Sequence, residues 1–383
     1  MLSRRNETKL DFLFINGGVT LWPSGGFEVT YQLATLLSQC GYSVGLLFIR
    51  DIYKQLMRLH PSPELEKFNK THRTYSIYSN LVNRKFGFIP KKIIRWMKGI
   101  HYDENFKGIE VFFSNGDYSP AASFGIANGW HNAIMVNNMK NIEKKYILAI
   151  QDDADARWTG ELNNLAKFGL SLDIPMIAVN SKVMKKYGPK VVGKIPLSIN
   201  TEFFRCLVPP EMRKEKIVLI PLRIGKYKGL PLGIDILEMI HRRDPSIIAI
   251  SFGNAPSSLV PMYVDHRGVI SNSELLELYN RASVFILPSL VEGYGLTALE
   301  AMICGAAVVT TDNEGIDEFA KDGVNAIIVK EFDPESIADE VLKLLQSDGT
   351  RINLVRNGIR TASLFNPNNM LSSFLKLIKE GES

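Results

Sequence analysis

Glu292 and Glu300, which are separated by seven residues, have a type and spacing that indicate chemistry. They lie in the segment Pro288-Ser-Leu-Val-Glu-Gly-Tyr-Gly-Leu-Thr-Ala-Leu-Glu-Ala-Met302. The apolar residues 283–287 predict a strand before this segment, followed by a glycine-rich loop and a helix that ends at Gly305. Loop amides and the positive end of a helix together form a site for a phosphate or another anion. Because carboxylates accept hydrogen bonds from hydroxyl groups, this combination suits a sugar nucleotide.

Each glutamate also has a structural interpretation that needs no ligand. Glu300 follows Thr297 by three positions, which is the spacing of a capping box at a helix start. Glu292 could be an exposed acid that the positive end of the helix favours. The occurrence of both acids around Gly293 and Gly295 favours the ligand-binding interpretation.

Residues 281–329 resemble the donor-site half of the family four retaining glycosyltransferases, which have the GT-B fold. The family pattern contains a glutamate, a Gly-aromatic-Gly loop and a second glutamate followed by Ala-Met and Cys-Gly. The matching residues here are Glu292, Gly293-Tyr294-Gly295, Glu300-Ala301-Met302 and Cys304-Gly305. Weaker similarity runs over most of the chain. The resemblance implies an α/β protein with two doubly wound, Rossmann-like domains that face each other across a cleft.

The resemblance also implies roles for individual residues. Glu300 is expected to accept hydrogen bonds from the ribose hydroxyls, and Glu292 is expected to reach the transferred sugar. Main-chain groups near these acids are expected to contact the phosphate, the sugar hydroxyls or the base. The expected donor-binding set is completed by Gly253, Val269, Ile270, Gly293, Tyr294, Gly295, Leu296 and Thr297.

Arg223 and Lys228 are the candidate catalytic cations. They follow the predicted strand 216–221 in the basic stretch Pro221-Leu-Arg-Ile-Gly-Lys-Tyr-Lys-Gly229. Transfer of a sugar from a nucleotide builds negative charge on the departing diphosphate, which two cations can stabilise without a metal. The family pattern has an arginine and a later Lys-Gly at this place. Lys226 competes with Lys228 for the second role, and a solvated basic turn is the structural alternative.

Two further sites are expected in the first half of the chain. Gly25-Gly26 precedes a helix predicted over 27–39, so its amides are expected to touch the donor phosphate or the acceptor, although a tight turn also explains the glycines. Many relatives have a histidine at the end of a mid-domain strand, close to the reacting sugar. Gln151 stands at that place here and is followed by Asp152, so the acceptor side is expected to bind sugar hydroxyls without a titrating base. His131 is interpreted as incidental.

Asp153-Ala-Asp155 has the Asp-x-Asp form with which metal-dependent GT-A transferases hold a divalent ion. Arg223 and Lys228 already supply positive charge for a diphosphate. We therefore expect no metal and no cofactor, with a nucleoside diphosphate sugar as the donor substrate.

Alternating strand and helix patterns predict two α/β domains. The first covers 1–200 and the second, which binds the nucleotide sugar, covers 208–365, with a linker near 193–200. The terminal segment 366–383 is expected to form a helix that crosses back onto the first domain, as in similar GT-B enzymes. The strands expected in the first domain are 10–16, 42–49, 110–114, 146–150 and 175–179.

The composition bounds the class of protein. The 383 residues are 45% hydrophobic, which is enough for two cores. The sequence has no apolar run long enough for a membrane span and no apolar stretch typical of a secretory signal at its start, so we expect a cytoplasmic protein. Cys40, Cys206 and Cys304 are interpreted as small buried apolar residues in a reducing compartment.

The charge is unevenly distributed along the chain. Residues 1–195 contain 26 Lys and Arg against 16 Asp and Glu, whereas the remainder contains 19 against 24. A cationic first domain suits an anionic phospholipid surface or a lipid-linked acceptor. Residues 84–100 interleave cations with aromatic and aliphatic side chains, which is typical of an interfacial helix but equally of an ordinary surface helix.

Taken together, these features predict a metal-independent glycosyltransferase that moves a hexose-type sugar from a nucleoside diphosphate sugar with retention of configuration. The expected acceptor is a glycan or a lipid-linked glycan of cell-envelope polysaccharide or glycolipid synthesis, at the inner face of a membrane. No nucleic-acid partner is expected. The alternatives are an epimerase or phosphorylase on the same fold, or a catalytically silent subunit that binds sugar nucleotides.

Overall fold

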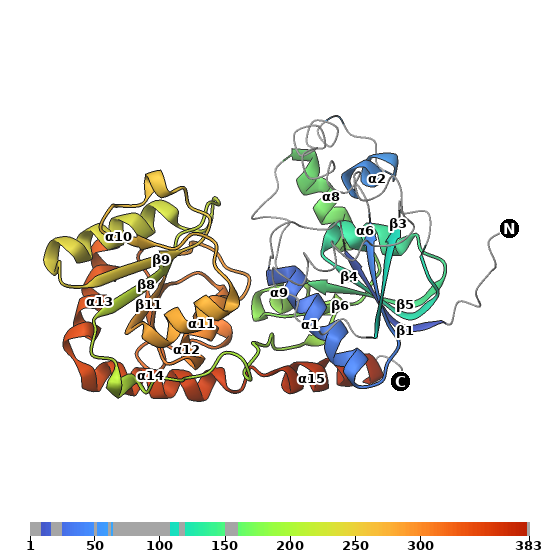
Figure 1. The fold of residues 1–383 in the computed structure, drawn as a ribbon. Coiled ribbons are helices and arrows are strands. Elements are labelled where there is room, and N and C mark those ends of the chain that lie inside the picture. The colour runs from blue at the N-terminus through green and yellow to red at the C-terminus, as the bar shows by residue number, and fades with distance from the viewer. Residues whose placement is uncertain are drawn as a thin grey trace. The chain divides into compact units, whose positions relative to one another are not determined.

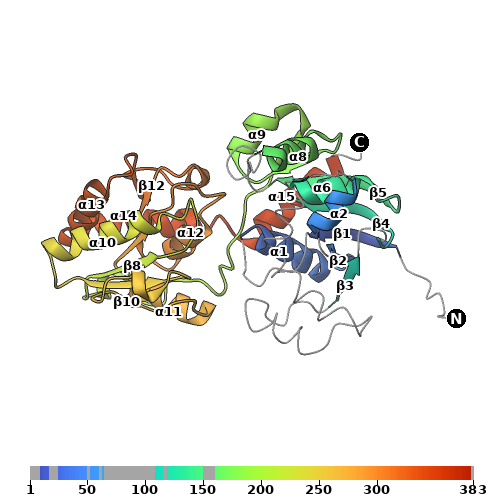
Figure 2. The same cartoon turned by 90° about the horizontal axis from the view of Figure 1, so that it is seen from above.

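The protein consists of two compact units in a computed structural model, which describes residues 9–16, 25–49, 52–59, 63, 108–114, 119–149 and 160–380. Unit 1 comprises Met1–Pro196 together with Met370–Ser383, and unit 2 comprises Leu197–Asn369 (Figure 1). The division falls four residues before the end of the first domain expected from the sequence. Both units are α/β layers around a central parallel sheet (Figure 2).

The sheet of unit 1 has seven parallel strands in the order β3-β2-β1-β4-β5-β6-β7. Its strands are β1 (Leu10–Asn16), β2 (Val44–Ile49), β3 (Ile109–Ser114), β4 (Ala122–Asn128), β5 (Ile142–Ala149), β6 (Met176–Ala178) and β7 (Val191–Lys194). The described helices of this unit are α1 (Gly25–Gln39), α2 (Ile52–Leu59), α6 (Trp130–Asn137), α8 (Gly160–Ser171) and α9 (Ser181–Tyr187). The last helix of the chain, α15 (Pro367–Glu380), lies mostly in this unit.

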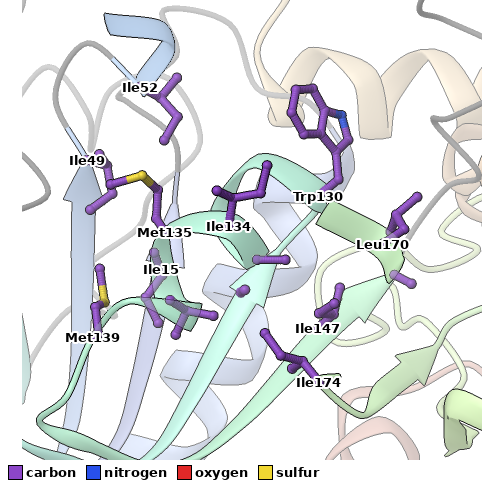
Figure 3. Packing of buried hydrophobic residues seen from close by; sticks show 14 of the residues in the cluster. Ile15, Ile49, Ile52, Trp130, Ile134, Met135, Met139, Ile147, Leu170 and Ile174 are labelled. Atoms are coloured by element: carbon purple, nitrogen blue, oxygen red, sulfur yellow. The ribbon is translucent and has the colours of Figure 1, made fainter. Parts of the chain in front are cut away.

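Strand β1 is buried on both faces, as expected of a near-continuous apolar run in a parallel sheet. Ile15 packs into a cluster with Ile134 of α6, with Ile147 of β5 in the same cluster (Figure 3). Phe12 instead meets Phe374 of α15, with ring centroids 5.8 Å apart. Side chains alternate between the two faces of a strand, so Phe12 and Ile15, three positions apart, point to opposite faces. Helices α6 and α15 therefore cover opposite faces of this sheet.

Two elements of unit 1 differ from the sequence expectation. Strand β4 was not expected, because its sequence Ala-Ser-Phe-Gly-Ile-Ala-Asn is rich in small residues that have weak strand preference. The segment 193–200, expected as linker, begins inside β7. Gly193 of β7 packs so closely on Leu377 of α15 that a Cβ atom would overlap the leucine side chain.

The sheet of unit 2 has six parallel strands in the order β10-β9-β8-β11-β12-β13. Its strands are β8 (Ile217–Pro221), β9 (Ile248–Phe252), β10 (Asp265–His266), β11 (Val284–Leu287), β12 (Ala307–Thr311) and β13 (Ile327–Val329). Its helices are α10 (Leu230–Arg243), α11 (Asn272–Arg281), α12 (Leu296–Ile303), α13 (Pro334–Gln346) and α14 (Asp348–Ala362). Helices α10 and α13 pack together, and α12 packs against α11 and α14 (Figure 1).

The cysteines only partly match the expectation. Cys304 is buried and Cys206 is half-buried, but Cys40 is exposed just after α1. The interpretation of Cys40 as a buried residue is therefore wrong, because the helix ends there at the surface. None of the described helices combines the length and the hydropathy that crossing a bilayer requires.

Candidate functional site

The candidate site lies where two adjacent strands of unit 2 end. Strands β8 and β11 pair with each other, whereas the strand that follows β8 in sequence, β9, lies on its other side. The chain therefore leaves β8 and β11 in opposite directions along the sheet. In open α/β sheets, ligands bind outside the carboxyl ends of the strands at such a switch point.

The loops after β8 and β11 are tied together by their backbones. The amide of Leu290 donates a hydrogen bond of 2.8 Å to the carbonyl of Tyr227. Gly229 has a φ of 64°, and a Cβ atom there would overlap the carbonyl oxygen of Pro288. Only glycine allows this close approach, which places Lys228 beside the loop that carries Glu292.

Glu292 is the centre of a cluster of hydrogen-bond donors. Lys228 Nζ lies 2.9 Å from both carboxylate oxygens, Arg223 Nη2 lies 3.3 Å from Oε1, and Ser289 Oγ donates to Oε1 at 2.7 Å. Only 11% of the Glu292 side chain is exposed. Burial acts to raise the pKa of Glu292, but the charges of Lys228 and Arg223 outweigh it and hold the pKa below its usual value. Glu292 is thus a largely buried carboxylate in an ion pair, and not the exposed acid of the structural alternative.

Lys226 does not share this cluster. Its ammonium lies over the ring of Tyr227, 5.1 Å from the centroid, and the residue is exposed. Of the two lysines that were candidates for the second catalytic cation, Lys228 is therefore the one that lies at the site. The Nε atom of Arg223 is buried and has no hydrogen-bond partner among the residues that the structure describes, so this guanidinium has donor capacity left for a ligand.

The carboxylate of Glu300, on α12, is bonded to a residue of the neighbouring helix α11 and not to the start of its own helix. Helix α12 has Gly295 as its N-cap, with φ of 83° and no capping side chain, so the interpretation of Thr297 and Glu300 as a capping box is wrong. Glu300 Oε2 instead accepts a hydrogen bond of 3.1 Å from the hydroxyl of Tyr279 on α11. The glutamate itself is half-buried.

The start of α12 and the loop after β9 supply main-chain groups. Leu296 and Thr297 are the first helical residues, and among the described residues no acceptor meets their amides, which suits an anion. At the end of β9, the amide of Gly253 donates to the carbonyl of Gly268 at 2.7 Å. The next residue, Val269, is 60% exposed, and Ile270 after it is half-buried.

The side chain of Tyr294 has a structural role in addition to the main-chain role that was expected from the sequence. Its buried hydroxyl accepts a hydrogen bond of 3.3 Å from the amide of Leu197, the first residue of unit 2. Its ring packs edge-on against Phe365, whose carbonyl accepts from the amide of Ile199. The Gly-Tyr-Gly loop is thereby joined to both segments through which the chain enters and leaves this unit.

Replacing Tyr294 with phenylalanine is expected to lower the free energy of unfolding by about 1–2 kcal/mol, because the buried amide of Leu197 loses its acceptor. Urea denaturation measures this change, and hydrogen exchange should be faster at the Leu197 amide. Tyr263→Phe is the matched control, since the Tyr263 residue is 36% exposed. Unchanged stability and exchange in Tyr294→Phe would show that the hydroxyl has no anchoring role.

In unit 1, polar side chains that are buried or half-buried gather at the carboxyl ends of β1 and β4. Asn16 ends β1 with no exposed surface, and its Nδ2 atom has no partner within the described ranges. Asn128 ends β4, and its Nδ2 atom donates to the Asn16 Oδ1 atom at 3.5 Å. His131 follows in α6, where burial lowers its pKa to about 4, so the imidazole is neutral at pH 7. Asn16 was not a candidate from the sequence, although an asparagine at the end of a mostly apolar strand indicates a buried polar group that needs a partner.

Several expected positions are placed differently or are not described. Helix α1 begins at Gly25, so Gly25 and Gly26 form its first turn and do not precede it. Gln151, Asp152, Asp153, Asp155 and the segment 84–100 lie outside the described residues. Within the described ranges, no group of three or more His, Cys, Asp or Glu side chains is arranged to hold a metal ion.

Residues 208–361 match the family described as glycosyl transferases group 1. Unit 2 is a group 1 glycosyltransferase domain. The match covers the strands, loops and helices that carry Arg223, Lys228, Glu292 and Glu300.

Two curated relatives share parts of the chain. An N,N'-diacetylbacillosaminyl-diphospho-undecaprenol alpha-1,3-N-acetylgalactosaminyltransferase of Campylobacter jejuni is 24% identical over 237 residues, which are 56% of this chain and 63% of the relative. A D-inositol 3-phosphate glycosyltransferase of Acidothermus cellulolyticus is 34% identical over 106 residues, 28% of this chain and 23% of the relative. The chain thus spans less than two thirds of the length of these relatives.

Solved structures share the fold over 97% of the chain. Sucrose-phosphate synthase from Thermosynechococcus elongatus superposes with a TM-score of 0.67 at 17% identity, covering 97% of this chain and 99% of that one. HepE of Anabaena, solved in complex with UDP-glucose, gives a TM-score of 0.68 at 14% identity, covering 97% and 100%. The chain accordingly has two Rossmann-like domains of the GT-B class, with the group 1 domain as the second.

Proposed function

We propose that the protein is a glycosyltransferase that moves a sugar from a nucleoside diphosphate sugar to a glycan or lipid-linked acceptor. The observation that carries this proposal is the cluster of Arg223, Lys228 and Glu292 at the switch point of a group 1 domain. Glu292 of this cluster lies in the loop that leads from β11 into α12, at whose start the amides of Leu296 and Thr297 lie. Two relatives support the substrate class, since the name of one contains a diphospho-undecaprenol acceptor and HepE was solved with UDP-glucose.

In the proposed reaction, Arg223 and Lys228 bind the diphosphate and stabilise the charge that develops on it as the bond to the sugar breaks. The amides of Leu296 and Thr297 hold the distal phosphate or the sugar hydroxyls. Glu300 accepts hydrogen bonds from the ribose, and Glu292 contacts the transferred sugar. These side chains bind and orient the donor, and none of them needs to form a covalent bond to it.

We further propose that transfer retains the anomeric configuration and needs no metal. The resemblance to family four implies a front-side displacement, in which the leaving phosphate takes the proton of the incoming hydroxyl on the same face of the sugar. The positive charge that a divalent ion would supply comes from Arg223 and Lys228, which lie 3.3 and 2.9 Å from one carboxylate. The proposed setting is synthesis of a cell-envelope polysaccharide or glycolipid.

Binding and transfer are tested in sequence. A thermal-shift panel of UDP-, GDP- and ADP-sugars should give one selected donor, with about 2.7 kcal/mol of stabilisation at a hundred times its dissociation constant. The selected donor is then incubated with glycan and lipid-diphosphate acceptors, with and without a chelator of divalent ions. We expect nucleoside diphosphate release that depends on the acceptor and resists the chelator.

The possible outcomes separate the proposal from the alternatives. Conversion of the donor sugar without any acceptor would indicate an epimerase, and a need for inorganic phosphate would indicate a phosphorylase. Donor binding without turnover for any acceptor would favour a silent binding subunit. Loss of turnover with the chelator would contradict the metal independence but would leave sugar transfer intact.

A further inference from the structure

We propose that Tyr279 is a positioning residue that sets Glu300 for recognition of the donor ribose. The inference rests on the proposed function and adds a residue of α11 to the nucleotide site. It starts from the hydrogen bond of 3.1 Å that the Tyr279 hydroxyl donates to Glu300 Oε2. This contact joins α11 to α12, and the two bonded residues are 21 positions apart in the sequence.

The ring of Tyr279 has little freedom to move. The residue has no exposed surface, and three aromatic rings meet it edge-on, with centroids at 5.6 to 6.5 Å. These rings belong to Phe204, Phe252 and Phe285. A phenol held by packing on this scale presents its hydroxyl in one place, so the bonded carboxylate oxygen is fixed as well.

The backbones of the two helices are also linked, through a buried arginine. Arg213 Nη1 donates to the carbonyl of Tyr279 at 3.2 Å, and its Nη2 donates to the carbonyl of Cys304, directly after α12, at 2.5 Å. The end of α11 and the end of α12 are thus bonded to one planar guanidinium. This link holds the ends of the two helices that carry Tyr279 and Glu300 close to each other.

The protonation states make the tyrosine a donor and the glutamate an acceptor. Burial, followed by the negative charge of Glu300, raises the pKa of Tyr279 well above its usual value, so the phenol keeps its proton. A carboxylate accepts several hydrogen bonds. With the phenol on Oε2, we assign Oε1 to the ribose hydroxyls, whose two neighbouring O–H groups need an acceptor in a defined orientation.

If Tyr279 only packs in the core, its replacement should weaken ribonucleotides and deoxynucleotides equally. If it positions Glu300, its replacement should weaken only the ligands that have the ribose hydroxyl. The experiment measures the dissociation constants of UDP, GDP and ADP, and of their 2′-deoxy and 3′-deoxy forms, by calorimetry with wild type and Tyr279→Phe. Wild type should prefer the ribonucleotide that it selects over at least one deoxy form by about ten- to a hundredfold, as for a hydrogen bond to a charged group. Tyr279→Phe should weaken the ribonucleotide about five- to tenfold and leave the deoxy form nearly unchanged.

Two further variants keep the result interpretable. Phe285→Leu disturbs the same aromatic packing without touching the hydroxyl, so it should lower stability and leave the ribose preference intact. Glu300→Gln should abolish the preference, as it removes the charge that accepts the hydrogen bond.

Equal weakening of ribose and deoxyribose ligands in Tyr279→Phe, or loss of the preference in Phe285→Leu, would overturn the positioning role. In either case the Glu300 contact and the proposed function would stand. An unchanged preference in Glu300→Gln would overturn both the Glu300 assignment and this inference. The acceptor-dependent release of nucleoside diphosphate, measured separately, would still test sugar transfer.

Discussion

Replacing Lys228 with alanine is expected to lower kcat about a hundred- to a thousandfold, with a smaller effect on donor KM. Removal of one preorganised group that stabilises developing charge commonly has this effect on a rate. Lys228 lies 2.9 Å from both oxygens of Glu292 and follows β8 at the switch point, where the departing diphosphate is proposed to bind. Steady-state kinetics with the selected donor and acceptor measure both parameters.

The chain offers a matched control for this prediction in the same loop. Lys226 is exposed and lies over the ring of Tyr227, so Lys226→Ala removes the same charge two residues away and should leave kcat within about twofold. Arg223→Ala should resemble Lys228→Ala, since its guanidinium contacts the same carboxylate. Equal losses in Lys226→Ala and Lys228→Ala would mean that only the general basicity of the loop matters.

Replacing Glu292 with glutamine is expected to lower kcat about ten- to a hundredfold and also to destabilise the fold. The loss of rate corresponds to one hydrogen bond between a charged group and the transferred sugar. Removal of one partner from a buried ion pair costs about 3–5 kcal/mol. Because the Arg223 and Lys228 side chains are 28% and 26% exposed, water stabilises them partly, and we expect about 2 kcal/mol here.

The pH dependence of stability provides a second measurement on the same variant. The folded-state pKa of Glu292 is lowered, so as the pH falls the unfolded chain takes up this proton first. The stabilisation is therefore present above about pH 4.5 and is lost as the pH falls through the folded pKa. Denaturation between pH 3 and 7 should show a flatter curve for Glu292→Gln than for wild type. Parallel curves would mean that the ion pair does not contribute to stability.

The donor-side site was accessible to sequence reasoning because its signals are local. An apolar strand, a glycine-rich loop and a helix with Glu292 and Glu300 at fixed spacing define their own geometry. By contrast, the ion pair of Lys228 with Glu292, 64 positions apart, was not expected from the sequence, which assigned the lysine to the diphosphate and the glutamate to the sugar. The structure then distinguished Lys228 from Lys226, which composition alone does not separate.

Other parts of the site had no such signal. Tyr279 has the appearance of a core aromatic in an amphipathic helix, and its contact with Glu300 depends on how α11 and α12 pack. The Tyr294 hydroxyl bonds to Leu197, 97 positions away, across a link that no local pattern encodes. Strand β4 was not predicted because its small residues have only a weak strand preference, although they can be buried in the centre of a sheet.

The ion pair at Glu292 has a consequence for how the donor enters. The two cations of the site face an internal anion, so the diphosphate of the proposed donor would exchange with a carboxylate and would not meet bare positive charge. The local field that draws nucleotides from a distance is weakened accordingly, and donor association should slow only modestly with added salt. Small anions such as chloride or inorganic phosphate must compete with a tethered group of high effective concentration, which protects the site from the commonest anions in the cell.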